Sequence, residues 1–158
     1  MWDEFFVAIA GAAAALTGLI FVGVSINLNR ILSFARLPDR ALQAIILMLT
    51  ILVASVLCLV PGQPILFIGL ELLCVGVAVW VISLRLDIRI YRQTAEKYRP
   101  QFLPQILLNE LATLPYIVAG VVVLTQGLDG FYWLVPAVVF SFIKAVFDAW
   151  VLLVEINR

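Results

Sequence analysis

The chain has 158 residues, of which 65% are hydrophobic and 13% are charged, and its mean hydropathy of +1.15 is typical of an integral membrane protein rather than a soluble domain. Ten basic and ten acidic side chains cancel, so the net charge does not indicate a nucleic acid partner. The absence of histidine removes the commonest proton relay and metal ligand, and we therefore expect no metal site and no cofactor.

Five apolar stretches are long enough to cross a bilayer core of about 30 Å, which takes about 20 residues in a helix. The first stretch is not predicted to be a signal peptide, because MWDEFF is acidic where a signal peptide is basic. The sequence thus predicts one all-α transmembrane domain over residues 1–158, with five helices over about 5–28, 38–60, 64–84, 104–125 and 130–154.

The first predicted helix carries small side chains on one face, at Gly11, Ala15 and Gly18. Small residues let two helices approach closely in lipid. We expect this face to pack against another helix, either within the monomer or in a homo-oligomer.

The third predicted helix is expected to extend beyond the membrane into a cytoplasmic segment over about 85–103. Arg85, Arg89 and Arg92 fall on one face of that extension. This pattern favours contact with anionic lipid headgroups. The alternative is a regulatory or voltage-sensing role, although sensor arginines lie within the span and these lie beyond it.

The connections between predicted helices alternate in charge. Basic residues occur between helices one and two and between helices three and four, whereas PGQP at 61–64 and TQGLDG at 125–130 contain none. Positive residues remain cytoplasmic. The sequence therefore predicts an inner-membrane protein with its N-terminus outside and its C-terminus inside.

Ionisable side chains within the predicted spans are the main functional signal, because such groups usually face protein or water and have a partner. Lys144 and Asp148 are four residues apart, so they can form an ion pair on a polar stripe that includes Ser141. Glu110 lies at a similar depth. We expect a buried polar network of these four residues, which serves either as a lock between helices four and five or directly in transport.

Glu71 has no obvious partner at its depth. With Glu110 and Asn109 it is our candidate for lining an ion pathway, and the alternative for Glu71 is a protonated helix contact. Five helices leave little room for a lumen, so a pore would require a homo-oligomer. The sequence favours an oligomeric channel or channel-like transport protein for cations or protons. The alternative is a non-conducting interaction or regulatory protein that binds another membrane complex.

An enzymatic function is not expected. No nucleophile and base are arranged for catalysis, and no glycine loop for phosphate is present. Cys58 and Cys74 lie in apolar runs and are expected to be reduced packing residues.

The segments FFVAIAGAAAALTGLIFVGVSINLNRIL, LVPGQP and GLELL resemble a family of small uncharacterised bacterial inner-membrane proteins over the first three predicted helices. Some members carry the label of modulator of a membrane-bound AAA protease. The resemblance implies a membrane partner and brings no catalytic or binding residues.

Overall fold

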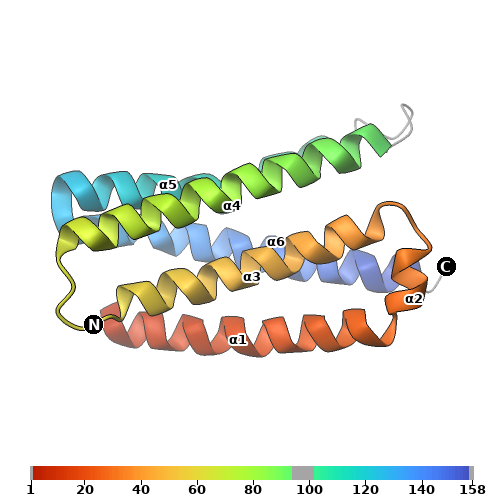
Figure 1. The fold of residues 1–158 in the computed structure, drawn as a ribbon, viewed down its shortest axis with the longest axis horizontal. Helices are drawn as coiled ribbons and strands as arrows, with labels where there is room; N and C mark the ends of the chain where they lie inside the picture. Colours follow the sequence, from red (N-terminus) through yellow and green to blue (C-terminus); the bar gives the residue numbers. More distant parts are fainter. Residues whose placement is uncertain (1, 94–101, 157–158) are drawn as a thin grey trace.

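The computed structural model describes residues 2–93 and 102–156, and these residues form helices and short connections without any strand. Four helical stretches are long and apolar enough to cross a membrane, which makes the chain a multi-pass membrane protein by length and composition. The fourth stretch, Leu103–Val154, makes two passes along the bundle (Figure 1). The elements are α1 (Trp2–Ile26), α2 (Leu28–Leu32), α3 (Leu37–Cys58), α4 (Ile65–Gln93), α5 (Leu103–Gln126), the 3-10 helix η2 (Gly127–Trp133) and α6 (Leu134–Ile156).

Local sequence signals explain three of the helix boundaries. Pro38 and Pro104 lie in the first turns of α3 and α5, where a missing backbone N–H costs nothing. Gly127 ends α5 with φ of 75°, a backbone conformation that glycine adopts without strain. The residues after it form η2, so the last helix starts at Leu134 rather than at the predicted residue 130.

The first and third predicted helices differ most from their expected bounds. Asn27 separates α1 from the short α2, so the first long helix ends before residue 28. By contrast, α4 continues past Leu84 to Gln93, and the predicted extension is therefore helical to that point. The rest of the predicted segment 85–103 includes residues 94–101, which lie outside the described residues.

The bundle is built from two extensive helix pairs. Helix α4 packs along α5 and α1 packs along α3, while α6 contacts both α3 and α5. Helix α1 barely touches α6 and lies at an edge of the bundle (Figure 1). The polar faces of α3, α4, α5 and α6 are therefore the ones that can meet in the interior.

Glycines bring α4 and α5 close together. A Cβ atom at Gly120 would lie 2.6 Å from the backbone nitrogen of Leu73, and one at Gly76 would lie 2.8 Å from the backbone nitrogen of Ile117. These distances are too short for any side chain, so the helices approach at glycine as lipid-embedded helices often do.

The two ends of the bundle differ in character. At the end where α1 begins, Trp2, Phe6, Phe131 and Tyr132 form an aromatic cluster, with ring centroids 5.1 Å apart for Phe6 and Phe131 and 5.0 Å for Trp2 and Tyr132. The opposite end holds α2 and the end of α4 (Figure 1). We call it the arginine end, because it carries the arginines of the described residues: Arg30, Arg36, Arg40, Arg85, Arg89 and Arg92.

Candidate functional site: a buried charge cluster

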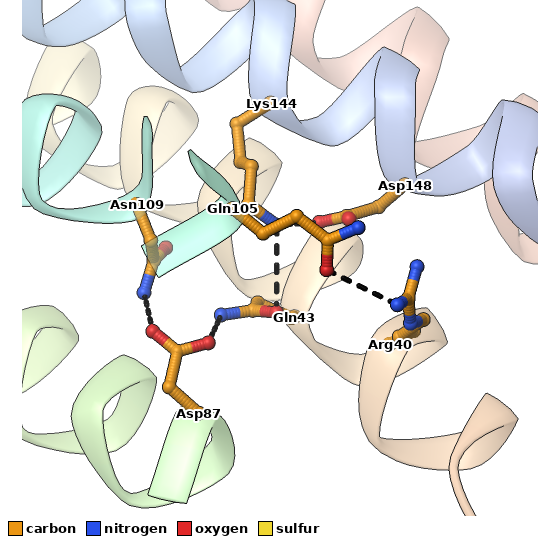
Figure 2. A network of polar contacts seen from close by, with 7 residues as sticks. All are labelled: Arg40, Gln43, Asp87, Gln105, Asn109, Lys144 and Asp148. Carbon is orange, nitrogen blue, oxygen red and sulfur yellow. Dashed lines mark hydrogen bonds and ion pairs between the residues drawn. The ribbon is translucent and has the colours of Figure 1, made fainter. Parts of the chain in front are cut away.

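Seven polar side chains meet in the interior of the bundle (Figure 2), and their positions along the helices place them in the half nearer the arginine end. They come from four helices, and helical spacing places the members from one helix on one face. Their contacts link all four helices through side chains alone. We call them the charge cluster: Arg40 and Gln43 of α3, Asp87 of α4, Gln105 and Asn109 of α5, and Lys144 and Asp148 of α6.

Lys144 and Asp148 form an ion pair along α6, as their spacing predicted. The side chains are each only 2% exposed. An unpaired charge in such a place would be costly, so each group is tolerated because of the other.

Asp87 is the hub of the cluster. Gln43 Nε2 donates a hydrogen bond of 2.9 Å to its Oδ1, and Asn109 Nδ2 donates one of 2.6 Å to its Oδ2. Each carboxylate oxygen thus has a neutral amide donor from a different helix. Lys144 Nζ in turn lies 3.5 Å from Gln43 Oε1, which connects Asp87 to α6 by a long, weak contact.

Arg40 joins the cluster from the arginine end. Its Nη2 donates a hydrogen bond of 3.1 Å to Gln105 Oε1, and it also attracts Asp148 electrostatically. The cluster holds two cationic groups, Arg40 and Lys144, and two carboxylates, Asp87 and Asp148, so the formal charges cancel. A charge-balanced group of this kind is what the interior of a membrane protein tolerates.

The polar interior stops near the middle of the bundle. Ser141 donates a hydrogen bond of 3.2 Å to the carbonyl of Ala112 and lies 3.4 Å from the hydroxyl of Tyr116. Beyond these residues, the buried side chains of α5 and α6 toward the aromatic cluster are apolar: Ala119, Val123, Leu134, Ala137 and Val138. Between α5 and α6, the described monomer therefore has a polar interior toward the arginine end and an apolar interior toward the aromatic cluster.

The structure does not bring Glu110 into the network predicted with Lys144, Asp148 and Ser141. Glu110 accepts a hydrogen bond of 2.9 Å from Trp80 Nε1 of α4. Neighbouring residues in a helix point about 100° apart, so Asn109 faces the interior while Glu110 faces Trp80. Ser141 also contacts Tyr116 rather than Lys144. The prediction for Glu110 was wrong, and Asn109 is the α5 residue of the cluster.

Glu71 was expected to have no partner, and this was also wrong. Gln63 Nε2, from the connection between α3 and α4, donates a hydrogen bond of 2.7 Å to it. Glu71 is half-buried and separate from the charge cluster. Both glutamates predicted to line an ion pathway therefore accept a hydrogen bond from a neutral donor. The donor is Gln63 for Glu71 and Trp80 for Glu110.

The small-residue face of α1 points away from the monomer. Gly11, Ala15 and Gly18 are exposed, and a Cβ atom at either glycine would meet nothing within 4 Å. The expectation of packing within the monomer was wrong, because the close glycine contacts lie between α4 and α5 instead. Packing against another chain stays a prediction.

Arg85, Arg89 and Arg92 share an exposed face of α4, where they line a shallow hollow with Ile88 and Gln93. Arg89 Nη1 lies 3.4 Å from Asp39 Oδ1 in an ion pair. Because the side chain of Arg89 is 65% exposed, solvent screens this pair and it contributes little to stability. Contact of this face with lipid headgroups stays a prediction.

The site residues predicted from the sequence did not include Arg40, Gln43, Asp87 or Gln105. Arg40 was counted with the basic residues between helices one and two, and Asp87 lay in the predicted cytoplasmic extension of helix three. A usable signal was present, since Gln43 is a lone amide in an apolar helix and Asp87 lies one turn from Ser83 on a buried face of α4.

Comparison of the chain with models of protein families, with curated protein sequences and with solved structures gives no match. Within the described residues, no three histidine, cysteine, aspartate or glutamate side chains come together as metal ligands. The function is therefore argued from the charge cluster itself.

Proposed function

We propose that this chain is a small transport protein that moves cations across a bacterial inner membrane, with the charge cluster as its ion site. The observation that carries the proposal is the burial of Asp87, 3% exposed, between two neutral amides in a four-helix network. Asp87 follows the predicted span 64–84 in the sequence, but the structure buries it against α3 and α5. Ionisable side chains buried among membrane helices are costly and characteristically mark ion pathways. The proposal places the functional carboxylate at Asp87 rather than at Glu71 or Glu110.

The charges of the cluster favour a cation over an anion. Lys144 is in direct contact with Asp148, so this cation is already neutralised. Asp87 has only neutral hydrogen-bond donors, so its charge is the least compensated in the deep part of the cluster. Arg40 is 9% exposed, donates to Gln105 and attracts Asp148 electrostatically, so its charge is also compensated within the cluster.

The interior of the bundle is polar toward the arginine end and closed by apolar side chains toward the aromatic cluster. This arrangement suits a carrier-like protein better than an open pore in one chain. Arg40 and the half-buried Gln105 are the members of the charge cluster nearest the arginine end, while apolar side chains close the other direction. Transport requires this closure to open, or several chains to assemble around a shared path. A homo-oligomer remains part of the proposal.

A non-conducting protein that binds and regulates another membrane complex is the second candidate. The exposed small residues Gly11, Ala15 and Gly18 of α1 favour it, because such a face suits close helix contact in lipid. A stable complex with a different membrane protein, together with absence of ion flux, would support this function instead.

Ion flux tests the proposal. Purified protein in lipid vesicles should take up at least one of sodium, potassium or protons faster than protein-free vesicles. Asp87→Asn keeps the side-chain shape and removes the charge, so uptake should fall by about tenfold or more, as for loss of an ion ligand. Glu71→Gln is the matched control and should leave uptake almost unchanged.

The flux proposal has two contradicting outcomes. Vesicles whose uptake equals the protein-free background for all three ions would contradict transport. Loss of uptake in Glu71→Gln with full uptake in Asp87→Asn would contradict the position of the site.

We also propose that the arginine end faces the cytoplasm, which gives an N-out, C-in topology by the positive-inside rule. A C-terminal alkaline phosphatase fusion, active only outside the cytoplasm, should be inactive, and a C-terminal fluorescent fusion should be bright. An active phosphatase at the C-terminus would reverse the orientation, and the charge cluster would then lie nearer the outer face.

A further inference from the structure

Two buried oxygen atoms beside Asp87 have no hydrogen-bond partner among the described residues: Asn109 Oδ1 and Ser83 Oγ. Asn109 is 0% exposed and Ser83 is 1% exposed. Buried polar atoms are nearly always satisfied in native proteins, because an unsatisfied one carries its full desolvation cost. Two of them beside one carboxylate indicate that this part of the charge cluster holds a further polar partner besides these side chains.

Both oxygens belong to the surroundings of the Asp87 carboxylate. Asn109 Oδ1 is part of the same amide group whose Nδ2 donates to Asp87 Oδ2. Ser83 lies one helical turn before Asp87 on α4, and both side chains are buried. Ser55 of α3 is also 1% exposed, but its hydroxyl donates a hydrogen bond of 2.7 Å to the carbonyl of Ile51. Burial alone therefore does not leave a serine without a partner.

We propose that Asp87, Asn109, Gln43 and Ser83 form an oxygen-lined site for a dehydrated monovalent cation such as sodium or potassium. This inference rests on the proposed function, because it names the ion class that binds at the same site. Protein oxygen atoms, carbonyl and carboxylate alike, replace the hydration shell of such ions. One carboxylate among neutral oxygens balances one positive charge and would leave a divalent ion uncompensated.

The two amides supply the means to switch between an ion-free and an ion-bound arrangement. Asn and Gln present donor NH2 and acceptor oxygen on nearly identical shapes, so rotation about the last side-chain bond exchanges them. In the structure the NH2 groups of Gln43 and Asn109 face Asp87. Rotation of both amides turns their oxygens to a cation held by the carboxylate.

Lys144 competes with such a cation for Gln43. Its Nζ lies 3.5 Å from Gln43 Oε1, and rotation of Gln43 would turn NH2 toward this ammonium. Lys144 keeps Asp148 as its partner in either arrangement. The ion pair on α6 therefore keeps Lys144 partnered when its contact with Gln43 is lost, and in this way it supports the ion site.

Thermal unfolding of the purified full chain in detergent tests the site without any flux. The unfolding midpoint should rise with the concentration of sodium or potassium chloride relative to choline chloride at equal ionic strength, because a ligand that binds the folded state stabilises it. Ser83→Ala removes an unpartnered hydroxyl and should weaken the apparent cation affinity about tenfold. Ser55→Ala is the matched control and should leave that affinity unchanged.

Asp87→Asn provides a second variant and should abolish the dependence on cations while the midpoint in choline remains measurable. Equal midpoints in sodium, potassium and choline would overturn the site, as would equal affinities in Ser83→Ala and Ser55→Ala or stronger stabilisation by magnesium or calcium than by either monovalent ion. Stabilisation by a monovalent cation without flux would leave the site standing and contradict transport. Flux without any cation-dependent stabilisation would contradict the site and leave transport standing.

Discussion

Replacement of Lys144 by methionine is expected to lower the free energy of unfolding by about 3–5 kcal/mol, because it leaves Asp148 as a buried carboxylate without its ion-pair partner. The side chain of Asp148 is 2% exposed, so water cannot take the place of the ammonium. Reversible unfolding in mixed detergent micelles, followed by circular dichroism, measures the change.

The double variant Lys144→Met with Asp148→Leu removes both charges at once. It should recover most of the lost stability, because replacing a buried pair by apolar side chains of similar size is often neutral or stabilising. Arg40 and Asp87 remain, so the formal charge of the cluster stays balanced. A double variant as unstable as the single one would show that the pair contributes through contacts other than mutual neutralisation.

Alanine at Gly120 is expected to destabilise the protein by about 1–3 kcal/mol, as overpacking of a close contact does. The new Cβ atom would lie 2.6 Å from the backbone nitrogen and 2.8 Å from the Cα atom of Leu73, so α4 and α5 must move apart. Since Asp87 and Asn109 bridge the same two helices, the charge cluster should loosen as well. The same unfolding measurement checks this change.

Gly18→Ala is the matched control on α1, where the added methyl group meets open space. Alanine favours the helix over glycine by about 1 kcal/mol, so this variant should be neutral or slightly more stable. Equal destabilisation by both substitutions would contradict the difference between the two glycine surfaces. A loss at Gly18 that depends on protein concentration would instead show that chains meet along this face.

Much of the fold was accessible from the sequence, because an apolar stretch long enough to cross a bilayer is a strong local signal. The positions of α3 and α5 differ by only a residue or two from their predicted bounds. The break at Asn27 and the 3-10 turn before Leu134 were missed. Asn27 lies inside the first apolar stretch and the last residues of η2 lie at the start of the fifth, where hydropathy changes little and only backbone geometry marks the end of a helix.

The site was accessible only in part, for a physical reason. Periodicity along one helix identified the Lys144 and Asp148 pair, which is a contact between residues four positions apart. By contrast, Gln43 contacts Asp87 and Lys144, which are 44 and 101 positions away in the sequence. No pattern within one helix predicts which other helix packs against it. Glu110 illustrates the same limit, because its depth matched Lys144 while its direction did not.

The revised assignment changes which carboxylate matters. Glu71 was favoured because no partner was evident from the sequence, and Glu110 was favoured because of its depth in the membrane. Both have neutral donors in the structure. Asp87 was set aside as part of a basic extension, yet it is the one carboxylate hydrogen-bonded by amides from two other helices in the described part of the chain. Burial and partners therefore identify it as the group on which ion binding should depend.

Cation uptake by vesicles that contain wild-type protein, Asp87→Asn or Glu71→Gln, measured side by side at equal protein density, tests the role of the charge cluster most directly. We predict uptake by the wild type and by Glu71→Gln and a loss of about tenfold or more in Asp87→Asn. Undiminished uptake by Asp87→Asn, in protein shown to be folded by its unfolding midpoint, would contradict the role of the charge cluster in transport.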